Sequence, residues 1–156
     1  RDTAGTLHDK LMETGARLIV KTLDAIETGD YEATQQAENT SIKPAPKIFR
    51  EDTFINFNKP ASEVYNFVRG MAPYPAAQAV LVNGEEELTI KIFESRLSDG
   101  SLDPGEIETD HKTYWHVGAA SGNIELLEVQ LPGKKRMKTR DLLNGFSLNK
   151  KAFMKK

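Results

Sequence analysis

The densest group of chemically active side chains is a basic turn (residues 132–140) near the C-terminal end of the sequence. An apolar run over residues 124–129 leads into Pro132-Gly133, a pair that ends strands and turns the chain. Five cations then fall within seven residues: Lys134, Lys135, Arg136, Lys138 and Arg140. Because like charges repel, such a cluster favours an anion opposite it, and a phosphate backbone is a common one. The alternative is a solvated turn whose charge only keeps the protein soluble.

The distribution of charge along the sequence favours a polyanionic partner. The 156-residue chain has a formal net charge of -2, which by itself says little. Residues 130–156 nevertheless contain nine Lys or Arg and one acid, whereas residues 47–129 contain seven bases and fourteen acids. A basic end section on an acidic body suggests that one face binds a polyanion.

The histidines and one pair of aromatic residues are the other candidates for a functional site. His8, His111 and His116 lack the spacing of metal ligands and have no cysteine beside them, so we expect no metal site and no catalytic residue among them. Tyr114 and Trp115 could stack on an unpaired base. More often such a pair places one ring in the core and the other near the surface, and that is our interpretation.

Composition excludes several classes of protein. The sequence has no cysteine, which rules out disulfides, thiolate metal sites and cysteine nucleophiles and is compatible with a cytoplasmic location. No apolar run approaches membrane-spanning length and no signal peptide opens the sequence, so we expect no membrane association. Because the sequence begins with Arg1 rather than Met, we expect a fragment or a trimmed product.

The first predicted element is an amphipathic helix that begins with Thr6 as its N-cap, has Asp9 at the third helical position, and ends at Gly29. Its stripe of apolar residues needs a partner, either in this chain or in another domain; the stripe comprises Leu11, Met12, Ala16, Leu18, Ile19, Leu23 and Ile26. Residues 31–46 are polar and end in Pro44-Ala45-Pro46, which predicts an extended linker.

The remainder of the sequence predicts short strands with few helices. Alternating or apolar runs indicate strands over residues 54–57, 78–82, 88–93, 113–119 and 124–129. Asn83-Gly84 predicts a hairpin. A helix is expected to start with Pro60 at its first position and to end near Gly70, and a short one covers residues 140–144. This pattern is typical of a mainly β, overall α+β, small closed or partly open barrel.

Several segments resemble, in the same order, those of the methionyl-tRNA formyltransferase family. Each match is weak alone, but their collinearity over nearly the whole chain makes the set specific. The segments are Asp2–Leu11, Ala45–Ile48, Ile55–Val64, Arg69-Gly70 with Pro73-Tyr74-Pro75, Leu126–Gln130, Pro132–Met137 and Asp141–Gly145.

The resemblance implies a two-domain enzyme that moves a formyl group from 10-formyltetrahydrofolate to the amine of methionyl-initiator tRNA. Residues 1–30 would be the last helix of a truncated Rossmann-like catalytic domain, residues 31–46 the linker, and residues 47–156 a tRNA-binding domain. That domain would be a small open Greek-key OB-like barrel with one or two short helices. The catalytic residues would precede Arg1, so we expect this piece to be inactive alone, to bind no cofactor itself and to be a monomer.

The resemblance also implies which residues contact RNA. Lys134, Lys135 and Arg136 would contact phosphates, with Lys138 and Arg140 supporting them. Lys47 and Arg50 stand where the family carries cations that face the tRNA, although they could instead pair with Glu51 or Asp52. Lys150, Lys151, Lys155 and Lys156 are expected to form a disordered electrostatic fringe.

One departure from the family is at a corner that usually reads Trp-Pro-Gly-Ala. Here the corner is Tyr74-Pro75-Ala76-Ala77, and alanine adopts a positive φ less readily than glycine. Either the backbone at Ala76 is ordinary or the corner has a different shape.

Two other functional classes remain open at this level. The chain could be a structural cap of a folate-dependent formyl hydrolase or of a sugar formyltransferase, binding no RNA. It could also be a free-standing interaction module. The basic turn disfavours the first alternative, and the unpartnered N-terminal helix disfavours the second.

Overall fold

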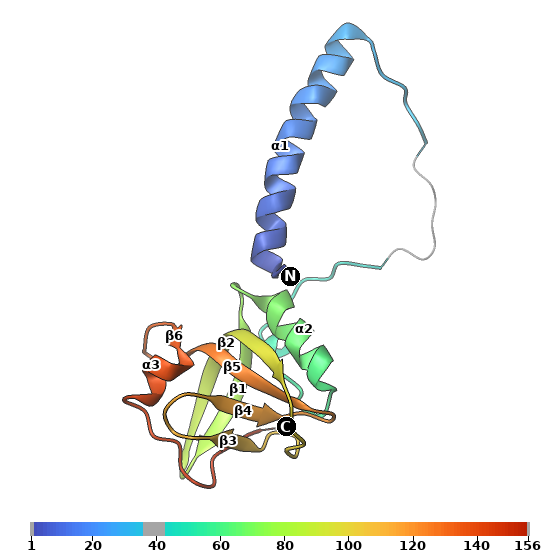
Figure 1. Cartoon of the computed structure of the whole chain (residues 1–156). Helices are drawn as coiled ribbons and strands as arrows, with labels where there is room; N and C mark the ends of the chain where they lie inside the picture. Colours follow the sequence, from blue (N-terminus) through green and yellow to red (C-terminus); the bar gives the residue numbers. More distant parts are fainter. Residues whose placement is uncertain (1, 36–42, 156) are drawn as a thin grey trace.

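The computed structural model describes residues 2–35 and 43–155, which form a long helix standing on a barrel-like sheet (Figure 1). The helices are α1 (Ala4–Thr28), the short 3-10 helix η1 (Glu51–Thr53), α2 (Ala61–Met71) and α3 (Thr139–Leu143). The strands are β1 (Ala77–Asn83), β2 (Glu86–Ser98), β3 (Ile107–Thr109), β4 (Trp115–Gly118), β5 (Asn123–Gln130), β6 (Met137–Lys138) and β7 (Phe153–Met154). None of the helices in these described ranges combines the length and apolar character needed to span a bilayer.

The strands form one seven-stranded antiparallel sheet in the order β3-β4-β5-β2-β1-β7, with β6 paired to β5. A bridge between Glu106 and Phe153 joins the two ends of this order, so the sheet is a nearly closed barrel. The mainly β fold, with few short helices and a long helix at the N-terminal end, is therefore confirmed.

The barrel interior is filled by side chains that alternate along the strands. Trp115 is fully buried on β4, Ile90 and Ile92 are fully buried on β2, and Phe57 is fully buried in the segment before α2. Helix α2 adds its own apolar face to the core through Ala61, Val64 and Val68. The interior is thus a packed core.

The Asn83-Gly84 hairpin is confirmed. Strands β1 and β2 pair from Ala77 opposite Ile92 to Asn83 opposite Glu86, which leaves a two-residue turn with Gly84 at φ 69°. Strand β2 extends beyond the prediction to Ser98, and its register with β5 shifts between Ile92 and Ser95. The prediction stopped at residue 93 because the last five residues of the strand are mostly polar and continue no apolar pattern.

Two predicted element starts were wrong. Helix α1 begins at Ala4 with Thr3 as its N-cap, because Thr6 N–H donates to Thr3 Oγ1 over 3.2 Å and Thr3 N–H donates to Thr6 Oγ1 over 2.9 Å. Thr6 is thus the third helical residue of this capping box. Pro60 caps α2 rather than occupying its first turn. The predicted end of α1 at Gly29, with φ 72°, is confirmed.

The segment predicted as a strand over residues 54–57 makes only one bridge, from Phe54 to Gln78 of β1. The predicted linker lies partly outside the described residues. Its described parts, residues 31–35 and 43–46, are exposed and have no regular secondary structure.

The corner after α2 does not have an ordinary backbone. Ala76 is fully buried and has φ 73°, in the left-handed region. Its N–H donates to the carbonyl of Met71 over 2.9 Å. The Ala72-Pro73 and Tyr74-Pro75 peptide bonds are both cis. The surrounding contacts therefore hold an alanine in a conformation that usually favours glycine.

Candidate nucleic-acid interface

The basic turn connects β5 to α3 and is held at its base by the sheet. Strand β6 pairs with β5, with Met137 opposite Val129. The buried hydroxyl of Thr139 donates to the carbonyl of Leu126 over 2.6 Å. At the tip, Lys134 N–H donates to the carbonyl of Leu131, and the Gln130 side-chain amide donates to the carbonyl of Lys134. The turn is thus a rigid support for the cations at its tip.

Two of the five cations are already charge-compensated within the protein. Arg136 is ion-paired with Glu128, and its guanidinium also lies 4.3 Å from the centre of the Phe93 ring. The hydrogen bond from Arg136 holds the pKa of Glu128 below its ordinary value. Lys138 lies 2.7 Å from a carboxylate oxygen of Glu94, which raises the Lys138 pKa, and 4.0 Å from Glu128.

The other three cations have no acidic partner. Lys134, Lys135 and Arg140 are exposed, and they make no ion pair with any residue in the part of the chain that the structure describes. An exposed cation without an internal counter-charge can neutralise a phosphate without first breaking a contact. The structure thus divides the predicted site into a free set (Lys134, Lys135 and Arg140) and a compensated set (Arg136 and Lys138).

Lys47 and Arg50 are exposed, and neither forms an ion pair with Glu51 or Asp52 within the described residues. Asp52 instead accepts a hydrogen bond from Phe49 N–H over 2.8 Å. The Lys47 ammonium lies 5.4 Å from the centre of the Phe49 ring. Both cations thus remain available at the start of the barrel.

The expectation of a disordered fringe is wrong for Lys155. Its N–H donates to the carbonyl of Val80, and its ammonium lies 2.6 Å from a carboxylate oxygen of Glu87, so the end of the chain helps to close the barrel. Lys150 and Lys151 are exposed in a turn before β7. Lys156 lies outside the described residues.

The interpretation of the two aromatic residues is confirmed. Trp115 is fully buried and cannot stack on a base, whereas Tyr114 is half-buried. The rings of Tyr114 and His116 have centroids 4.6 Å apart. Burial and the nearby carboxylates of Glu108 and Asp110 raise the pKa of the Tyr114 hydroxyl.

Sequence reasoning missed a polar cluster that four strands bring together. A ring nitrogen of His116 lies 3.3 Å from a carboxylate oxygen of Glu108, and the other lies 3.5 Å from the buried Glu125. Arg96 is ion-paired with the same Glu125 oxygen: its Nε donates over 2.7 Å and its Nη2 lies 2.6 Å away. The cluster follows from the strand register, which sets His116 opposite both Glu108 and Glu125 and which the sequence does not give. No set of three or more His, Cys, Asp or Glu side chains suited to a metal ion occurs in residues 2–35 and 43–155.

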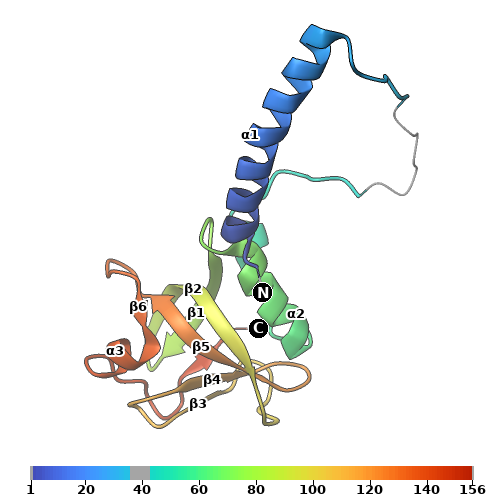
Figure 2. The ribbon, with the colours of Figure 1, turned by 45° about the horizontal axis from the view of Figure 1, so that its top comes forward.

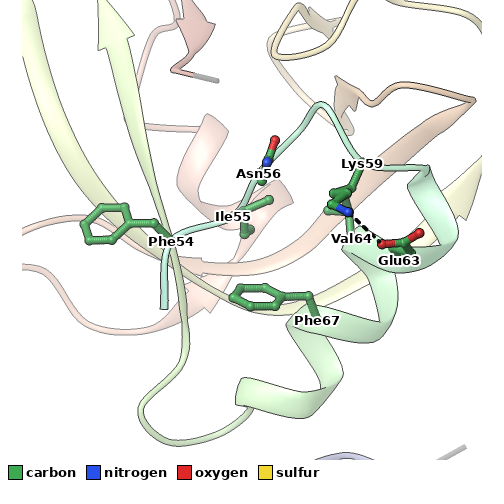
Figure 3. A pocket seen from close by; sticks show the side chains of 7 residues that line it. All are labelled: Phe54, Ile55, Asn56, Lys59, Glu63, Val64 and Phe67. Carbon is green, nitrogen blue, oxygen red and sulfur yellow. Dashed lines mark ion pairs between the residues drawn. The ribbon is translucent and has the colours of Figure 1, made fainter. Parts of the chain in front are cut away.

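Of the hollows on the described part of the barrel, two are relevant to a binding site. The first, of about 240 Å³, is lined mainly by Phe54, Ile55, Val64 and Phe67, with the Lys59–Glu63 ion pair at its rim (Figure 3). Its apolar lining does not suit phosphate. The second, of about 300 Å³, lies beside the basic turn and joins it to the start of α1; its lining includes Thr3, Thr6, Asp9, Ala72, Pro73, Phe93, Glu94 and Arg136.

Comparison with known proteins agrees with these features. Residues 47–147 match the family described as "Formyl transferase, C-terminal domain". The chain is 45% identical to a methionyl-tRNA formyltransferase of Bacteroides fragilis, covering 99% of this chain and 49% of that protein. It is 41% identical to a protein of the same name from Parabacteroides distasonis, covering 93% of this chain and 47% of that one. The chain thus spans about half the length of these curated relatives.

Among solved structures, the chain resembles HypX from Aquifex aeolicus in complex with tetrahydrofolic acid. The TM-score is 0.58 at 17% identity, and the match covers 88% of this chain and 26% of that one, so it concerns the fold alone. The sequence resemblance is confirmed by the family match and by the relatives' names. The chain therefore belongs to the formyl transferase family, whose C-terminal domain it contains.

Proposed function

We propose that this chain is the tRNA-binding part of a methionyl-tRNA formyltransferase and that the free cations of the basic turn hold the tRNA backbone. One observation carries the proposal: Lys134 and Lys135 project unpaired from a turn whose base is fastened to β5. The names of the relatives support methionyl-tRNA as the substrate. The basic turn distinguishes this proposal from the alternative of a structural cap that binds no RNA.

In this proposal the two halves of the enzyme have different roles, catalysis and tRNA binding. Formyl transfer from 10-formyltetrahydrofolate to the methionyl amine takes place on the half of the enzyme outside this sequence. Residues 47–156 supply affinity and placement, because cations that neutralise phosphates release condensed counterions. The tRNA is thereby held so that its acceptor end meets the catalytic half. Phosphate contacts carry little sequence information, so selection of the initiator tRNA depends mostly on that other half.

Helix α1 belongs, in this proposal, to the catalytic half, with residues 31–46 as the linker. The helix buries no residue in the described structure. Leu11, Leu18 and Leu23 on it are 62%, 61% and 58% exposed, which is a large apolar area for a single helix to leave in water. Packing against the catalytic half would cover them. We expect the whole enzyme to be a cytoplasmic monomer.

The experiment is binding of a fluorescent tRNA transcript to this chain over a series of salt concentrations. We expect weak binding with a log–log salt slope of roughly 2 to 4, since each phosphate contact releases about 0.7–0.9 ions. Changing the free set, Lys134, Lys135 and Arg140, together to Ala should remove most of the binding. No binding at low salt would favour the structural cap, and binding that survives the triple change would move the site to Lys47 and Arg50.

A further inference from the structure

The start of α1 is fastened to the barrel by a small joint at the end of α2. Gly5 N–H donates to the carbonyl of Ala72 over 3.0 Å, and the Arg69 guanidinium donates to the carbonyl of Asp2 over 2.7 Å. Arg69 is itself oriented by Asn66, which accepts a second hydrogen bond over 2.9 Å, and by the Tyr65 ring at 5.1 Å. Figure 2 shows the base of α1 against α2 at this point.

The joint is too close for any side chain at position 5. A Cβ atom there would lie 2.4 Å from Cδ and 3.2 Å from Cγ of Pro73. The proline ring is stiff, so it cannot move aside as the end of a long side chain could. Glycine at position 5 is what permits this backbone approach. Gly15, three turns further along the same helix, would place a Cβ within 4 Å of nothing in the described chain.

Little else in the described structure restrains α1. None of its residues is buried, and the described parts of the linker are exposed. Figures 1 and 2 both show the helix rising away from the barrel from this single point. Its direction is therefore set by contacts at its N-terminal end, made by Asp2 and Gly5.

The joint lies directly beside the basic turn. Thr3, the N-cap of α1, and Thr6 in its first turn line the same hollow as Phe93 and Arg136, and Pro73 lies on its wall. Any domain carried on α1 is thus placed relative to the basic turn through one short chain of contacts.

We infer that Gly5 and Arg69 are positioning residues that fix the direction of α1 and so set the distance between the basic turn and the half of the enzyme attached to that helix. A 25-residue helix is about 37 Å long, so a tilt of about 10° at its base moves its far end by about 6 Å. Catalysis tolerates only much smaller displacements of a substrate than this one. This catalytic consequence rests on the proposed function; the direction of the helix does not.

The direct test measures the helix direction in this chain without RNA. Because the sequence has no cysteine, Glu27→Cys on α1 and Ser62→Cys on α2 supply two unique sites for spin labels. Pulsed electron resonance should give one narrow distance distribution for the parent and for the control Gly15→Ala. Gly5→Ala and, independently, Arg69→Gln should broaden or shift it, while circular dichroism shows the fold retained. An unchanged distribution in both variants would overturn the inference.

The catalytic consequence is tested in the full-length enzyme. Gly5→Ala should lower kcat by about tenfold or more with little change in KM for the tRNA, because the basic turn is untouched. Gly70→Ala, whose Cβ would meet nothing within 4 Å in the described chain, is the control and should leave both constants unchanged. An unaltered kcat despite a displaced helix would overturn this consequence. Failure of tRNA binding in the parent chain would instead count against the proposed function.

Discussion

The guanidinium of Arg136 lies 4.3 Å from the centre of the Phe93 ring, across the boundary between the basic turn and β2. The same guanidinium is ion-paired with Glu128 on β5, so two strands hold it in place. Lys135 and Lys134, one and two residues earlier, have no such partner among the described residues. One short run of cations therefore supplies both an internal anchor and an exposed, uncompensated tip.

Replacing Glu128 with Gln should strengthen RNA binding at low salt. The change removes a negative charge next to the proposed phosphate site and releases Arg136 from its ion pair. If Arg136 then contacts one more phosphate, the salt slope should rise by about 0.7–0.9. Titration of labelled tRNA into the variant and the parent over the same salt series measures both effects. Weaker binding by Glu128→Gln would mean that Arg136 works only in its anchored position.

Glu128 should also make the stability of the barrel depend on pH. Arg136 lowers the pKa of Glu128 in the folded state, so the pair contributes stability above the ordinary glutamate pKa and loses it as the pH falls through the lowered value. The parent should therefore lose more stability than Glu128→Gln between about pH 5 and pH 3. Thermal unfolding of both proteins across this range is the measurement, and parallel curves would refute the assignment.

Gly118 on β4 should be intolerant of any side chain. A Cβ there would lie 2.2 Å from the carbonyl oxygen of Asp103 and 2.6 Å from that of Leu102, and backbone atoms cannot rotate away. We expect Gly118→Ala to cost about 3 kcal/mol in the free energy of unfolding. Gly145→Ala is the matched control, because its Cβ would meet nothing within 4 Å in the described chain; it should change stability by about 0.5 kcal/mol or less. Denaturant unfolding should separate the two, and equal stabilities would show that the β4 backbone can shift.

Features that depend only on neighbouring residues in the sequence could be predicted. The Asn83-Gly84 turn and the run of five cations are each contiguous, so the hairpin and the position of the basic turn follow from the sequence. The start of α1 was misplaced because either Thr3 or Thr6 could serve as the N-cap. The reciprocal hydrogen bonds between them, which only the structure shows, make Thr3 the N-cap. The sequence left two alternatives for the backbone at Ala76 and could not decide between them; the structure shows a positive φ, with the Ala76 N–H bonded to the carbonyl of Met71.

Features that depend on strand register could not be predicted. Glu94 reaches Lys138 from a strand whose pairing with β5 shifts twice near that residue. No pattern of residue types reveals where such shifts occur. The split of the basic turn into free and compensated cations therefore required the structure. So did the close approach of Gly5 to Pro73, which are 68 residues apart in the sequence.

The most direct test of the central claim compares two charge reversals of equal size on the same molecule. Lys134→Glu with Lys135→Glu alters the tip of the basic turn, and Lys150→Glu with Lys151→Glu alters an exposed lysine pair before β7. Both double variants change the net charge equally, so they differ only in where the charge lies. At about 0.1 M salt we expect the first to weaken tRNA binding at least tenfold and the second to have a far smaller effect. Equal losses would contradict a site on the basic turn and indicate attraction by overall charge alone.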